Sequence, residues 1–136
     1  MRLDTLKSQS GALPYLLIDG VEHVVLITSH VTGGWVLPKG SIEPGMSSVE
    51  SAANEALEEA GVLGDMEEEI VGTYRYVKYS TLHEVTMYLL RVTEVLSEWD
   101  EMDSRERQIV PLDLAIELVE DNVAPILTIF RDSETG

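Results

Sequence analysis

The stretch that decides the fold is Gly40–Val62, which reads GSIEPGMSSVESAANEALEEAGV. Its first part is rich in glycine and proline and predicts a loop, and the part from Ser47 to Ala60 predicts a helix. Ser47 and Glu50 form a capping-box pattern at the start of that helix, and Gly61 suits the left-handed position just past its end. The apolar stripe of the helix comprises Val49, Ala52, Ala53, Ala56, Leu57 and Ala60. Because most of these residues are alanine, we expect the helix backbone to lie close to the layer beneath it.

Three glutamates lie near the end of the same helix. Glu55, Glu58 and Glu59 are spaced i, i+3 and i+4, so their side chains emerge within roughly a 100° arc. Repulsion between like charges and the negative end of the helix dipole each cost a few tenths of a kcal/mol here. A divalent cation would reverse both effects, because Mg²⁺ prefers carboxylate oxygens together with substrate phosphates. The alternative is a solvated acidic face, but the preceding glycine-rich loop and the following Gly61 favour a metal site.

Composition narrows the class of protein. The chain has 136 residues, 44% of them apolar, which suits a single domain over residues 1–136. Nine basic residues against 25 acidic ones give a net charge of −16, which argues against duplex nucleic acid as a partner. The chain has no cysteine, so thiolate metal sites are excluded. Its apolar runs are too short to span a membrane and no secretory signal is visible, so we expect no membrane partner and a cytoplasmic location.

The rest of the chain alternates between β-type and helical segments. Residues 23–28 are nearly continuously apolar, which is typical of a central strand covered on both faces. Asp19-Gly20 precedes them, and we expect there a hairpin loop longer than the tight two-residue form. Residues 1–9 predict a frayed end or an edge strand. The predicted strands are 12–18, 23–28, 35–37, 69–80, 82–95 and 109–110, and the later helices are 112–119 and 123–130. This order predicts an α/β fold, a mixed sheet with helices on both sides.

The central stretch, Gly40–Val62, matches a known sequence pattern at several positions. It resembles the Nudix box, G-x5-E-x7-R-E-U-x-E-E-x-G-U, where U is a bulky aliphatic residue. The segments 35–40, 74–78 and 92–99 are similar to the branch of that family that acts on diphosphoinositol polyphosphates and dinucleoside polyphosphates. The resemblance implies the α/β/α Nudix sandwich, dependence on Mg²⁺ or Mn²⁺, and hydrolysis of a small-molecule diphosphate. The matching box residues are Gly40, Glu55, Glu58, Glu59, Gly61 and Val62.

The resemblance also assigns roles. It implies that Glu58 and Glu59 are metal ligands and that Glu55 is a further ligand or the base that activates water. The backbone carbonyl of Gly40 would complete the metal site. Glu55 and Glu58 are therefore the catalytic candidates, and the choice of base stays open between members of the family.

Basic residues near the box are candidates for substrate binding. Lys39, Arg75 and Lys78 lie in segments expected to border the box, and we interpret them as phosphate contacts, with ordinary surface charge as the alternative. Ser10 is included with them, although Ser10 and Leu16 stand where related sequences often carry basic residues. That difference favours a nucleotide-type diphosphate over a highly phosphorylated inositol.

Two box positions depart from the pattern. Met46 replaces a glutamate and Asn54 replaces an arginine that is thought to orient the catalytic glutamates. Losses of such supporting residues commonly cost about 10–100-fold in metal affinity or activity. Two hypotheses follow: a weakened Mg²⁺-dependent pyrophosphohydrolase, or a Nudix-fold binding or regulatory module without turnover. The loop acids Glu101, Asp103 and Glu106 could supply a distal ligand or base, and the oligomeric state is left open, a homodimer included.

Overall fold

The computed structural model describes residues 6–135, and within them the chain forms one mixed sheet of seven strands. The main path of the sheet is β3-β2-β1-β6-β5, with β4 paired to β1 and β7 paired to β2. β1 runs parallel to β6, and the other pairs are antiparallel. The strands are β1 (Leu6–Ile18), β2 (Val21–Thr28), β3 (Trp35–Val36), β4 (Lys39–Ser41), β5 (Val62–Lys78), β6 (Thr81–Val95) and β7 (Arg107–Pro111).

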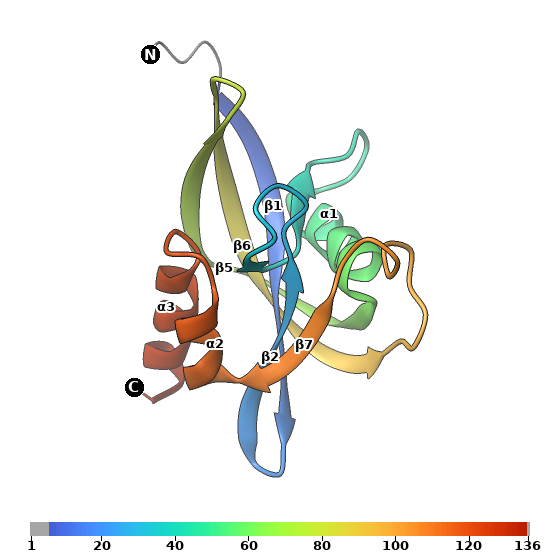
Figure 1. Cartoon of the computed structure of the whole chain (residues 1–136), viewed down its shortest axis with the longest axis vertical. Helices are drawn as coiled ribbons and strands as arrows, with labels where there is room; N and C mark the ends of the chain where they lie inside the picture. Colours follow the sequence, from blue (N-terminus) through green and yellow to red (C-terminus); the bar gives the residue numbers. More distant parts are fainter. Residues whose placement is uncertain (1–5, 136) are drawn as a thin grey trace.

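Helices cover both faces of this sheet (Figure 1). On one face lie α1 (Ser48–Glu55) and its π-helical continuation η1 (Ala56–Ala60). On the other lie α2 (Leu112–Leu118) and α3 (Ala124–Thr135). The predicted α/β/α sandwich is thereby confirmed. Among the helices that the structure describes, none combines the length and the apolar character needed to cross a membrane.

The core has two parts, one on each face. Along β2 the fully buried side chains alternate, with Val24 and Leu26 in the cluster under α2 and α3, and Val25 and Ile27 in the cluster under α1. This confirms the prediction of a central strand covered on both faces. The cluster under α1 includes three fully buried alanines of the predicted stripe, which are Ala52, Ala56 and Ala60.

The first hairpin differs from the prediction. Ile18 pairs directly with Val21, so Asp19 and Gly20 alone form the turn, with φ angles of 52° and 79°. The expectation of a longer loop was therefore wrong, because an aspartate can adopt the left-handed conformation that a tight two-residue turn requires. Residues 6–9 belong to β1, and residues 1–5 of the predicted frayed or edge segment lie outside the described residues.

The loop before α1 lies directly on the sheet. Ser10 pairs with Gly40 and Gly11 with Lys39, and the Ala12 N–H donates to the Pro38 carbonyl at 3.1 Å. A Cβ atom on Gly11 would lie 2.6 Å from the Pro38 carbonyl oxygen, so this close approach requires glycine. These contacts hold β4 alongside β1 in the sheet, next to the end of the helix.

Candidate active site

Local contacts set the two ends of the predicted helix. The Ser47 hydroxyl accepts from the Glu50 N–H at 3.1 Å and the Glu50 carboxylate accepts from the Ser47 N–H at 2.9 Å, which confirms the capping box. Gly61 has a φ of 65°, as predicted for the residue past the helix end. The last turn, however, is π-helical rather than α-helical. A π turn changes the angular spacing of side chains, and such turns are frequent at functional sites.

Glu55 lies against Gly40, as the predicted site requires. Its carboxyl group is so close that a Cβ atom on residue 40 would collide with it. Glu55 is only 8% exposed, and burial, followed by the neighbouring Glu58 carboxylate, raises its pKa. The structure therefore explains why this loop position is a glycine.

Glu59 is held by two donors. The Lys39 backbone N–H donates to Oε1 at 3.0 Å, and Arg105 Nη2 donates to Oε2 at 3.1 Å. Burial raises the pKa of Glu59 to about 8, while the Arg105 guanidinium and the Lys39 N–H oppose that change. Arg105, which the sequence analysis did not identify, is itself 10% exposed.

Glu58 meets two acids from the loop between β6 and β7. One carboxylate oxygen from each of Glu58, Asp100 and Glu101 lies within 4.8 Å of the others. The Glu101 N–H also donates to the Glu58 carbonyl at 3.0 Å, which ties the loop to the helix. Carboxylate oxygens at this spacing are a donor set that Mg²⁺ or Mn²⁺ accepts, so these residues fit a divalent cation. Glu101 was considered from the sequence, but Asp100 was missed.

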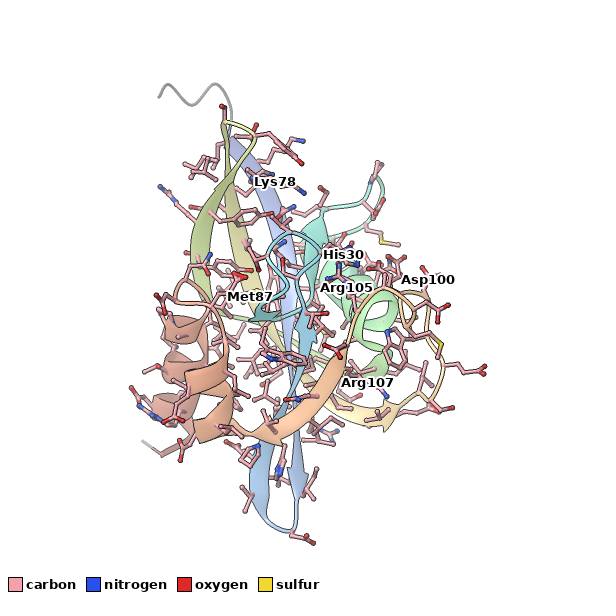
Figure 2. The ribbon with its side chains drawn as sticks, viewed as in Figure 1. His30, Lys78, Met87, Asp100, Arg105 and Arg107 are labelled. Atoms are coloured by element: carbon pink, nitrogen blue, oxygen red, sulfur yellow. The ribbon has the colours of Figure 1, made fainter. Side chains whose placement is uncertain are left out.

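The same loop is anchored on the end of η1. Trp99 Nε1 donates to the Glu59 carbonyl at 3.0 Å, and Arg107 Nη1 donates to the Ala60 carbonyl at 2.9 Å. The Arg107 guanidinium lies 3.9 Å from the centre of the Trp99 ring. A Cβ atom on Gly61 would lie 2.7 Å from Trp99, so glycine is needed here for space as well as for its φ. Figure 2 shows Asp100, Arg105 and Arg107 on this side of the molecule, around the end of the helix.

A cavity of about 300 Å³ opens next to Glu59. Tyr76 forms part of its wall, with its ring stacked on His83 at 4.6 Å and its hydroxyl donating to Gln9 Oε1 at 2.6 Å. The Lys39 ammonium group lies 4.7 Å from the Tyr76 ring centre. The charged and aromatic residues around this part of the cavity wall include Lys39, Glu59, Tyr74, Tyr76, Lys78 and Arg105.

Similarity to known proteins identifies the family. The model of the NUDIX domain matches residues 9–130. The chain belongs to the Nudix family. Nudix hydrolase 4 of Arabidopsis thaliana is 34% identical over 121 residues, 82% of this chain and 58% of that protein. Diphosphoinositol polyphosphate phosphohydrolase 2 of Rattus norvegicus is 29% identical over 95 residues, 70% of this chain and 51% of that protein. The chain thus spans between half and three fifths of the length of these Nudix relatives.

Solved Nudix structures share the fold. The C. elegans Ap4A hydrolase has a TM-score of 0.80 at 19% identity, covering 95% of this chain and 98% of that one. The NUDIX domain of Shewanella oneidensis NrtR, complexed with ADP ribose, has a TM-score of 0.76 at 14% identity, covering 94% and 88%. At these identities the likeness establishes the fold alone.

Two of the predicted substrate contacts line the cavity and two do not. Lys39 and Lys78 line it. Arg75 is 61% exposed, and its guanidinium pairs with Glu84 at 2.8 Å. Ser10 is fully buried, and neither it nor Arg75 is a lining residue.

The two departures from the Nudix box lie in different surroundings. Met46 is 40% exposed in the loop before α1. Asn54 is half-buried, and its Nδ2 donates to Glu58 Oε1 at 3.0 Å. Asn54 therefore still supports one box glutamate, but without the positive charge of the arginine in the pattern.

Proposed function

We propose that this chain is a hydrolase that uses Mg²⁺ or Mn²⁺ to cleave the diphosphate linkage of a small molecule. One observation carries the proposal: the Glu58 carboxylate lies with two loop carboxylates next to the buried Glu55 and Glu59, and Glu59 borders a cavity that also presents lysines. Such an arrangement suits a phosphate chain held between metal and lysines. The acids are Glu55, Glu58, Glu59, Asp100 and Glu101, and the lysines are Lys39 and Lys78.

We assign different roles to the acids near the end of the helix. Glu58, Asp100 and Glu101 would hold the metal. The further candidates are the predicted ligands Glu55, Glu59 and the Gly40 carbonyl. When bound, a divalent cation neutralises charge on the phosphates and favours attack by water. The proton of the attacking water is accepted by Glu55 or Glu58.

The cavity supports a nucleotide-type substrate. Two tyrosines, Tyr74 and Tyr76, form part of its wall, and such partly apolar side chains suit the border of a base or a ribose. The side-chain cations that line it are Lys39, Lys78 and Arg105, and Arg105 is already paired with glutamates. A highly phosphorylated inositol would need more cations than this. The Ap4A hydrolase fold and the ADP ribose complex among the structural relatives are consistent with the same class.

The second candidate function is a binding module without turnover. Met46 and Asn54 favour it, because both lack the charge of the residues in the box pattern. The retained box glutamates favour hydrolysis. The cytoplasmic location and the homodimer stay predictions, and some relatives carry names that include the words chloroplastic and mitochondrial.

An assay that separates each substrate from its cleavage products by anion-exchange chromatography tests the proposal. The substrates are diadenosine polyphosphates, ADP-ribose, nucleoside triphosphates and diphosphoinositols, each with Mg²⁺, with Mn²⁺ and with chelator. We expect metal-dependent cleavage of at least one nucleotide diphosphate. Binding of a nucleotide without cleavage of any substrate would support the module instead, and neither binding nor cleavage would contradict both candidates.

A further inference from the structure

The acidic cluster lacks the arginine that the Nudix box places on the helix. Asn54 gives one hydrogen bond to Glu58 but brings no positive charge to the cluster. Glu59 is nonetheless buried, and its ionised form, which a metal ligand or an ion pair requires, is costly without a paired cation. A cation from elsewhere in the chain is therefore needed.

Arg105 supplies that cation from the loop before β7. Its Nη2 donates to Glu59 Oε2 at 3.1 Å, its Nε to Glu101 Oε1 at 2.8 Å, and its Nη1 to the Thr28 carbonyl at 2.8 Å. One nearly buried guanidinium thus links a box glutamate, a loop carboxylate and the end of β2. The planar fork of arginine fixes the direction of each partner, which a lysine ammonium group does not do.

We propose that Arg105 is a positioning residue that takes the place of the missing box arginine. It orients Glu59 and Glu101, and it holds the Glu101 carboxylate beside those of Glu58 and Asp100, where the three would together bind a metal. Each carboxylate has about four acceptor sites, so the bonds to Arg105 leave sites free on both acids. The inference rests on the proposed function, because the orientation matters only if a cation binds.

The neighbouring Arg107 shows what a purely structural role looks like. Arg107 donates to the Ala60 backbone carbonyl and stacks on Trp99, so its contacts hold the helix end and the loop. Arg105 instead donates to two carboxylates of the cluster. Arg105 also lines the cavity, so direct contact with a substrate phosphate is the alternative that the experiment must separate.

The experiment measures Mn²⁺ affinity by calorimetry without any substrate, on folded variants checked by circular dichroism. We expect Arg105→Met to weaken Mn²⁺ binding by about 10–100-fold. Loss of a nearby positive charge would by itself strengthen cation binding, so a weakening reports lost orientation. Arg91→Met is the charge-matched control. Arg91 on β6 pairs with Asp65 on β5, which is not part of the acidic cluster, so this variant should bind Mn²⁺ like the wild type.

Rescue completes the test. In the Arg105→Met background, adding Asn54→Arg should raise the Mn²⁺ affinity about tenfold. In the wild type, Asn54→Arg should change the Mn²⁺ affinity by less than about threefold, since Arg105 already provides the support. If Arg105→Met does not fold, Arg105→Lys carries the same comparison. Unchanged Mn²⁺ affinity in folded Arg105→Met overturns the inference, and a raised KM alone then identifies a substrate contact. If the wild type itself binds no Mn²⁺, the proposed function fails before this inference.

Discussion

On the α2/α3 face of the sheet the core consists of large apolar side chains such as Leu26 and Phe130, whereas on the α1 face the helix contributes mainly alanines. The small side chains of Ala56 and Ala60 let the end of the helix approach the sheet closely. Glu59 can then accept a hydrogen bond from the Lys39 backbone N–H in β4, the strand paired with β1. The comparison teaches that large apolar side chains, and hence stability, are concentrated on the α2/α3 face. On the α1 face the small helix side chains let charged groups lie close to the sheet.

The largest expected effect is on the apolar face. Phe130 is 1% exposed and packs on the Tyr15 ring with 5.0 Å between centroids. Phe130→Ala should lower the free energy of unfolding by about 3–5 kcal/mol, because it leaves a cavity in the core. Urea denaturation measures this loss. Activity per folded molecule should change less than about twofold, and a large loss of activity in folded protein would mean that the two faces are not separate in function.

The next effect is on the charged face. Glu58→Gln should lower kcat/KM by at least about 100-fold, since it removes a carboxylate from the metal cluster rather than a supporting residue. Its stability should stay equal or rise slightly, because negative charge in a crowded turn is removed. Glu117→Gln on α2 is the matched control, with an exposed side chain of the same type. Equal activity of the two variants at saturating metal would show that Glu58 has no role in catalysis.

The last effect concerns pH. The pKa of Glu59 is raised to about 8 by burial, so the folded protein without metal binds this proton more tightly than the unfolded chain does. Its contribution to stability is therefore present below about pH 4.5 and is lost as the pH rises toward 8, by at most about 1.4 kcal/mol per pH unit. Chemical denaturation between pH 5 and pH 8, in chelator, measures the slope. Glu59→Gln should reduce that slope relative to Glu117→Gln, and an unchanged slope would contradict the assignment.

The parts of the site that the sequence predicted are those set by neighbours in the chain. The capping pair at Ser47, the left-handed Gly61 and the alanine stripe all follow from local geometry. The packing of Glu55 against Gly40 was implied by the resemblance to the box, because both belong to one continuous motif.

The parts that were missed depend on contacts between distant segments. Asp100 and Arg105 reach the cluster only because Trp99 and Arg107 dock the loop on the helix end. No spacing along the chain reveals that docking. The π-helical turn was also missed, because the residues of Ala56–Ala60 are equally compatible with an α-helical turn.

The most direct test of the account is a calorimetric titration of Mn²⁺ into the wild type, Glu58→Gln and Glu117→Gln, with and without a non-hydrolysable nucleotide diphosphate. We predict that the wild type and Glu117→Gln bind Mn²⁺ and that the nucleotide tightens the binding. Glu58→Gln should bind Mn²⁺ at least about tenfold more weakly. The same Mn²⁺ affinity in all three proteins, or none in any of them, would contradict the claim that the acids at the end of this helix form a metal site.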